Sequence, residues 1–203
     1  KKNGCTQLKF GIEAGSQTML DIMEKRFEVG DIKKALFICH KHGVFTAPDG
    51  FMVGMPGENL KTIRESGKLM GEIAAKERVS LDIRYDSIDI PYALPLCGTP
   101  MYEYGKQFGL IGQTEAEEEK FLEQTSNVGA HKRYYINLNG APMSEVVFWD
   151  ILFYLEASRT YAKLMKGKTE DEEMKKKYIS ILKLHQNNPH ASAKRKKYKI
   201  LGI

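Results

Sequence analysis

The sequence is poor in cysteine and has no long apolar run, and each of these absences excludes a class of protein. Cys5, Cys39 and Cys97 are widely spaced and odd in number among 203 residues, which excludes a disulfide framework and a close-spaced thiolate metal site. The longest apolar stretch, residues 146–155, contains Asp150 and is shorter than the roughly 20 residues that a membrane helix needs. We therefore expect a soluble, cytoplasmic protein that does not enter a membrane.

The first residues also lack an initiator methionine, an apolar signal core and a transit-peptide pattern. We therefore expect the chain to be part of a longer protein. The charge excess is small, with 31 Lys and Arg against 26 Asp and Glu and a net charge of +5. Only Tyr198 interrupts the basic run at residues 194–199, so we interpret this run as a solvated tail and expect no nucleic acid partner.

Hydrophobic periodicity predicts strands that alternate with helices. Residues 7–13 alternate strictly, which places three apolar residues on one face of a strand, Leu8, Phe10 and Ile12. Two further strands are predicted at residues 44–54, clearest at 50–54, and at residues 81–91. Helices are predicted at residues 16–23 with Ser16 as the N-cap, from Asp31 to Gly43, and at residues 60–76. Because strands separated by such helices form right-handed βαβ units, we expect a parallel sheet.

After Pro91 the chain changes character. A loop rich in Pro and Gly, residues 91–105, leads into a charged and helical part of the sequence. Its most distinctive stretch, residues 144–164, carries several aromatic residues on one predicted helix side, Trp149, Phe153, Tyr154 and Tyr161. Two interpretations stay open: this side packs as core, which we favour, or it lines a substrate chamber. A capping-box pattern at residues 169–172 predicts one more helix.

Two predicted strand ends carry residues suited to a ligand, because ligands of parallel α/β folds gather at the carboxyl ends of the strands. Glu13 and Ser16 follow the first strand, where a carboxylate beside a helix start could hold hydroxyl or amino groups. Gly50 and Gly54 flank Met52 on one face of the second strand and would leave room for a flat ligand. The alternatives are a capped turn with a solvated Glu13, and glycines that only permit a bend.

Three segments, taken in order, resemble one enzyme family. They are residues 10–17 (FGIEAGSQ), 50–58 (GFMVGMPGE) and 97–102 (CGTPMY). The set resembles the second half of the core of radical S-adenosylmethionine (SAM) enzymes. It is most similar to the group that also carries a cobalamin-binding domain, such as anaerobic magnesium-protoporphyrin ester cyclase and its methylase relatives. The resemblance covers roughly the first half of the chain.

The resemblance implies a role for each matching residue. Glu13 would contact the ribose or the methionyl part of SAM, with Ser16 as a neighbouring polar contact. The adenine would lie beside the second strand, at Met52, Val53 and Gly54. The rigid loop after the third strand would border the substrate opening, at Gly98, Thr99, Pro100 and Tyr102.

The implied fold is α/β. Residues 1–112 would form the carboxyl-terminal half of a TIM-type (β/α) barrel with about three parallel strands, and residues 113–203 would form a helical extension with a basic tail. The four-iron four-sulfur cluster of the family needs a CxxxCxxC loop, which the three cysteines do not provide. The cluster, and any cobalamin, would then be held by the missing N-terminal half of the parent protein. The chain alone would bind no cofactor and would be inactive.

In the parent, the implied reaction is the reductive cleavage of SAM to a deoxyadenosyl radical, which leads to methylation, cyclisation or oxidation of a substrate that the extension would select. A hypothesis from another class is a stand-alone half-barrel interaction module that self-associates or binds a partner. In both cases an apolar sheet face would need a cover in water. We therefore expect a homodimer, or the extension folded across that face.

Overall fold

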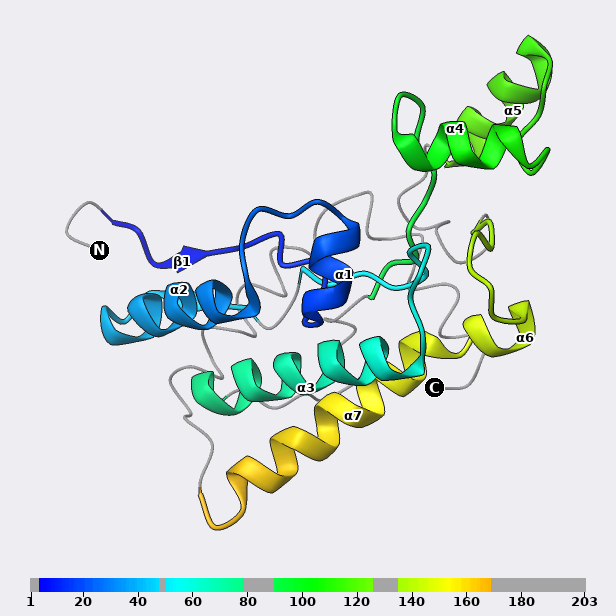
Figure 1. Cartoon of the computed structure of the whole chain (residues 1–203). Helices are drawn as coiled ribbons and strands as arrows, with labels where there is room; N and C mark the ends of the chain where they lie inside the picture. The colour runs from blue at the N-terminus through cyan, green and yellow to red at the C-terminus, as the bar shows by residue number, and fades with distance from the viewer. Residues whose placement is uncertain (1–3, 48–49, 79–89, 126–134, 169–203) are drawn as a thin grey trace, which may run out of the picture.

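The computed structural model describes residues 4–47, 50–78, 90–125 and 135–168. The strands are β1 (Gln7–Leu8) and β2 (Phe45–Thr46), and the helices are α1 (Gln17–Ile22), α2 (Val29–Lys41), α3 (Leu60–Glu77), α4 (Pro100–Gln107), α5 (Glu115–Thr125), α6 (Met143–Val146) and α7 (Trp149–Met165) (Figure 1). This part of the chain is therefore mixed α/β, mostly helical, with two short parallel strands. None of its helices has the length and apolar character needed to cross a membrane.

Three extended segments run parallel and side by side. β1 pairs with β2, with Gln7 opposite Phe45, and farther along Glu13 and Phe51 form an isolated parallel bridge. A second bridge joins Val53 to Tyr92, where the Val53 amide donates to the Pro91 carbonyl at 2.9 Å. The predicted order of adjacent segments is confirmed where they are described, although the ladders are short. Most of the predicted strand at 81–91 lies outside the described residues, and the partial barrel stays a prediction.

Local capping signals explain where the helices begin. Ser16 is the N-cap of α1, and α3 begins at Leu60, both as predicted. α2 begins two residues earlier than the predicted start at Asp31. The reason is a capping box, in which the Glu28 amide donates to the Asp31 carboxylate at 3.1 Å while the Glu28 side chain accepts from the Asp31 amide.

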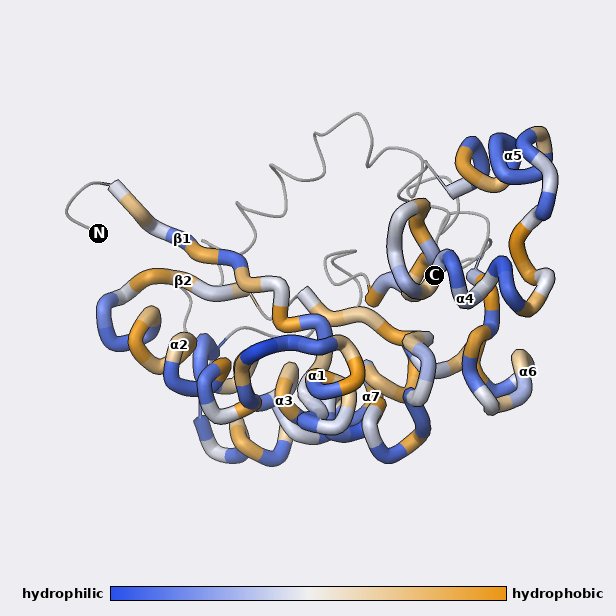
Figure 2. Tube along the Cα trace, turned by 45° about the horizontal axis from the view of Figure 1, so that its top comes forward, coloured by the Kyte–Doolittle hydropathy of each residue, from blue (hydrophilic) through white to orange (hydrophobic). Residues whose placement is uncertain are grey.

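The core lies where α3 meets α7. Figure 2 shows α2, α3 and α7 on one side of the paired extended segments. Trp149 and Phe153 of α7 are buried, and the Phe153 ring meets the Phe51 ring edge-on with centroids 5.3 Å apart. The aromatic stretch therefore packs as core, the interpretation favoured from the sequence. Residues from both sides of position 112 share this hydrophobic cluster, and the domain boundary there stays a prediction.

α4 and α5 form an arm that projects from the helical layer (Figure 1). Residues 91–105 are predicted from the sequence to form one loop, but α4 already begins at Pro100. Thr99 caps it by accepting the Tyr102 amide, and proline is favoured at the first helical position because its missing N–H is not needed there. Glu118 of α5 joins the two helices of the arm, because it accepts a hydrogen bond from the Tyr102 hydroxyl of α4 at 2.5 Å and pairs with Lys106. The capping-box segment 169–172 and the basic run lie outside the described residues.

Candidate functional site

Glu13 stands at the carboxyl end of the first extended segment. Its amide donates to the Gly50 carbonyl at 2.6 Å and its carbonyl accepts the Met52 amide at 2.9 Å, so its backbone is fixed by the neighbouring segment. Its φ of 65° is left-handed, a conformation that costs a residue with a side chain about 1 kcal/mol. The carboxylate is 24% exposed and lies 3.5 Å from the Lys25 ammonium. The fold therefore holds an accessible, charged carboxylate in a strained backbone at this edge.

Ser16 is turned away from that edge. It is buried, and its hydroxyl donates to the Glu65 carboxylate of α3. The preceding amide, of Gly15, donates to the Ser66 hydroxyl at 2.8 Å. A Cβ on Gly15 would lie 2.8 Å from the Ser66 Cα, which explains why glycine stands there. Ser16 therefore ties the end of the first segment to α3, and its hydroxyl is already engaged by protein.

The second segment alternates as predicted but does not leave the expected space. Phe51 and Val53 are buried toward the helices, and Met52 on the other face is half-buried. A Cβ on Gly54 would lie 2.6 Å from the Tyr135 ring, whose hydroxyl donates to the Gly54 carbonyl at 2.9 Å. A Cβ on Gly50 would collide with the Phe10 carbonyl. Both glycines are therefore needed for close packing, and a tyrosine ring occupies the place where the pattern indicated a flat ligand.

Glu58 is the site residue that the sequence argument missed. It is 2% exposed, its Oε2 accepts the Gly54 amide at 2.5 Å, and its Oε1 has no hydrogen-bond partner within the described ranges. Burial raises the pKa of its carboxyl to about 8. A carboxyl that titrates near neutral pH can take up and release a proton, which is typical of functional sites. The sequence feature that could have indicated Glu58 is its position, because this carboxylate comes directly after the turn that ends a predicted strand.

Asn139 and Tyr135 lock the turn that carries Glu58. The Asn139 side-chain amide donates to the Met55 carbonyl at 3.0 Å and to the Glu58 carbonyl at 2.8 Å. Tyr135 packs on the Tyr92 ring with centroids 5.1 Å apart, and burial raises the pKa of both phenols above the ordinary value. The Tyr92 hydroxyl donates to the Val146 carbonyl at 2.9 Å. The edge around Gly54 is thus a rigid polar network built from segments far apart in the chain.

The residues predicted to border a substrate opening belong to the start of the arm. Gly98 has a φ of 81° with nothing near its Cβ position, and Thr99 and Pro100 begin α4. Tyr102 is 3% exposed because its hydroxyl is bound by Glu118 within the arm. Of this group, Gly98 and Pro100 remain accessible, whereas Tyr102 serves the packing of α4 on α5.

The described residues do not fit an iron–sulfur cluster. Cys39 is buried while Cys5 and Cys97 are exposed, and no group of three or more His, Cys, Asp or Glu side chains in the described ranges could hold a metal ion. For SAM the fit is partial, since Glu13 offers an accessible acceptor and Met52 a half-buried side chain, whereas Gly54 is covered. We therefore derive no chemical step through a cluster.

Comparison with known proteins gives one partial match. No protein-family model matches the chain. A stretch of 63 residues is 32% identical to an uncharacterized protein of Methanocaldococcus jannaschii. The match covers 31% of this chain and 19% of that protein, so the chain spans about a fifth of the length of the relative.

Proposed function

We propose that this chain is the carboxyl-terminal part of a radical SAM enzyme core, and that the carboxyl ends of its parallel segments contribute to SAM binding in a longer parent protein. One observation carries the proposal. The first two motif-bearing segments are adjacent and parallel, with Glu13 bridged to Phe51, and the chain that leads into the third motif pairs beside them through the bridge of Val53 with Tyr92. Ligands of parallel α/β folds bind at this edge, which supports the assignment.

Glu13 is the central residue of the proposed site. Its carboxylate, which is partly exposed beside the Lys25 ammonium, would accept hydrogen bonds from ribose hydroxyls or from the methionyl amino group of SAM. The half-buried Met52 side chain would contact the apolar part of the ligand. The Gly54 amide and carbonyl are bound by Glu58 and Tyr135, so Gly54 would contribute shape rather than hydrogen bonds.

In a longer parent, an iron–sulfur cluster and SAM would supply the radical chemistry for methylation, cyclisation or oxidation that the resemblance implies. The residues of this chain would bind and orient SAM and would keep water from the edge around Glu58. The cluster ligands, and a cobalamin if the parent has one, would come from another part of that protein. The isolated chain is expected to bind SAM weakly or not at all.

Replacing Glu13 by glycine tests the site without endangering the fold. Glycine adopts a left-handed φ freely, so we expect Glu13→Gly to leave the free energy of unfolding unchanged or to raise it by up to about 1 kcal/mol. In the full-length protein the same variant should weaken SAM binding at least tenfold, on the order of 1.4 kcal/mol, as measured by calorimetry.

Glu24→Gly is the matched control, because Glu24 is exposed and also has a left-handed φ, of 55°. It should show the same effect on unfolding and no effect on SAM affinity. If Glu13→Gly binds SAM as tightly as the wild type, the site assignment is wrong. If the full-length protein binds no SAM at all, the proposed function itself fails.

The alternative, an interaction module, draws on a different observation. The projecting arm exposes large apolar side chains, with Tyr104 43% and Phe108 62% accessible. A partner protein that covers this arm, together with absence of SAM binding in the full-length protein, would favour the module over the enzyme.

A further inference from the structure

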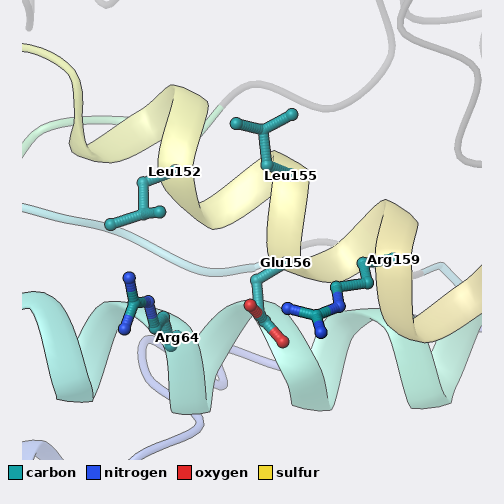
Figure 3. Close-up of a pocket in the computed structure, with 5 residues that line it drawn as sticks. All are labelled: Arg64, Leu152, Leu155, Glu156 and Arg159. Carbon is teal, nitrogen blue, oxygen red and sulfur yellow. The ribbon is translucent and has the colours of Figure 1, made fainter.

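A groove lies on the outer side of the α3–α7 pair. Its volume is about 510 Å³, and it is lined by Arg64, Leu152, Leu155, Glu156 and Arg159. Figure 3 shows Leu152 and Arg64 directed toward each other across the groove, Glu156 directed toward α3, and the Arg159 guanidinium directed toward the Glu156 carboxylate. Leu155 points away from α3 and is 63% exposed. The surface thus combines two guanidinium groups with an apolar wall.

Positive charges outnumber negative ones among the residues that line this groove. Within the described ranges neither Arg64 nor Arg159 has a carboxylate within ion-pair distance. Glu156 is the one acidic residue of the lining, so the groove carries a net positive charge. Guanidinium groups bind carboxylates in a two-point geometry, and the leucines favour an apolar side chain beside them. The groove therefore suits a segment that presents two carboxylates and an apolar residue.

α5 presents that combination. Glu115, Glu119 and Leu122 follow an i, i+4, i+7 spacing, which places them on one side of the helix. All three are exposed, Leu122 by 41%, and neither glutamate has an ion-pair partner among the described residues. Glu118, which pairs with Lys106 of α4, lies on the adjoining part of the helix surface, three residues from Glu115 and four from Leu122.

The arm and the groove of one molecule do not meet. In Figures 1 and 2 the arm of α4 and α5 extends away from the middle of α3 and α7. When a two-fold axis relates two copies, the arm of each copy can meet the groove of the other, and each copy then gives and receives the same contact.

We propose that two copies of this chain associate by exchange of their arms, with α5 of each copy lying in the α3–α7 groove of the other. Glu115 and Glu119 face Arg64 and Arg159, and Leu122 packs on Leu152 and Leu155. The contact occurs twice in the dimer, which doubles the buried area. This interface differs from the sheet face that the sequence analysis expected a dimer to cover, and it does not depend on the proposed function.

Charge reversal in the full-length protein tests the proposal by analytical ultracentrifugation. The wild type is expected to be a dimer at about 50 mM salt and to dissociate at about 500 mM, because exposed ion pairs are screened. Arg64→Glu with Arg159→Glu should raise the dissociation constant more than tenfold. Adding Glu115→Arg and Glu119→Arg to that variant should restore the dimer, since the paired charges are exchanged.

The matched control is Arg26→Glu with Lys41→Glu, which changes the net charge equally at two exposed positions without ion-pair partners in the described part. It should dimerise like the wild type. A monomeric wild type would overturn the proposal, and binding of inorganic phosphate by that monomer would assign the groove to small anions. A dimer that survives the groove variant would place the interface elsewhere and would overturn it as well.

Discussion

Replacing both Gly67 and Gly71 by alanine is expected to lower the free energy of unfolding by roughly 2 kcal/mol. The two glycines face α7, where a Cβ on Gly67 would lie 2.5 Å from the Phe153 carbonyl oxygen and a Cβ on Gly71 would collide with the Ala157 carbonyl. These are backbone atoms that cannot rotate away, so α3 and α7 must separate. Each extra methyl in a packed core lowers the free energy of unfolding by about 1–3 kcal/mol. The better helix propensity of alanine offsets only about 1 kcal/mol of this loss per site.

Gly30→Ala in α2 is the control for helix propensity. Gly30 lies in a helix and has nothing within 4 Å of its Cβ position, so alanine should stabilise the protein there by about 0.5–1 kcal/mol. Urea unfolding followed by circular dichroism measures both variants. If the α3 double variant unfolds at the wild-type urea concentration, the close contact between α3 and α7 does not exist in solution.

Glu58→Gln is expected to alter how the free energy of unfolding changes with pH. The difference in this free energy between wild type and variant should shift by on the order of 5 kcal/mol from acid to alkaline pH. Burial raises the pKa of the Glu58 carboxyl from 4.5 to about 8 in the folded protein. Because the folded pKa is the higher one, the favourable contribution of Glu58 is fully present below pH 4.5 and is lost as the pH rises toward 8. The wild type should therefore match or exceed the variant in stability near pH 5, and should be clearly less stable than the variant at pH 9.

The difference between wild type and variant isolates Glu58 from other groups. Glu77 is also buried, and burial raises its pKa, but it is present in both proteins. Glu117→Gln is a control of opposite sign, because hydrogen bonds from Thr114 lower the pKa of the exposed Glu117 carboxyl. The free energy of unfolding of the wild type should increase relative to that of this variant as the pH rises out of the acid range. A Glu58→Gln curve parallel to the wild-type curve between pH 5 and 9 would contradict the burial of a titrating carboxyl.

Sequence periodicity predicted those features that depend on neighbouring residues. Helix α3 and the N-cap at Ser16 follow from local capping and spacing, and both were predicted to within a residue. The alternation around Met52 was also correct, because a strand turns successive side chains to opposite faces. The start of α2 was placed too late because Glu28 was not recognised as the partner of Asp31 in a capping box.

Features that depend on distant residues could not be predicted. The open space beside Gly54 was inferred from two glycines on one strand face, but Tyr135, 81 residues away, fills it. The sequence placed Leu8 and Ile12 on one apolar face, but it could not indicate that Leu8 is 43% exposed while Ile12 is 3% exposed. The strain at Glu13 and the elevated pKa of Glu58 likewise arise from tertiary contacts.

The pairing of α3 with α7 has a consequence for how this chain acquires its structure during synthesis. α3 ends at Glu77 but its partner helix begins only at Trp149, so a ribosome must add some seventy residues before the glycine face of α3 can be covered. Until then Ile63 and Met70, both fully buried in the finished core, are open to chaperones and to other nascent chains. The folding rate should be limited by closure of this long loop. A version of the chain that stops before Trp149 would expose the same surface permanently.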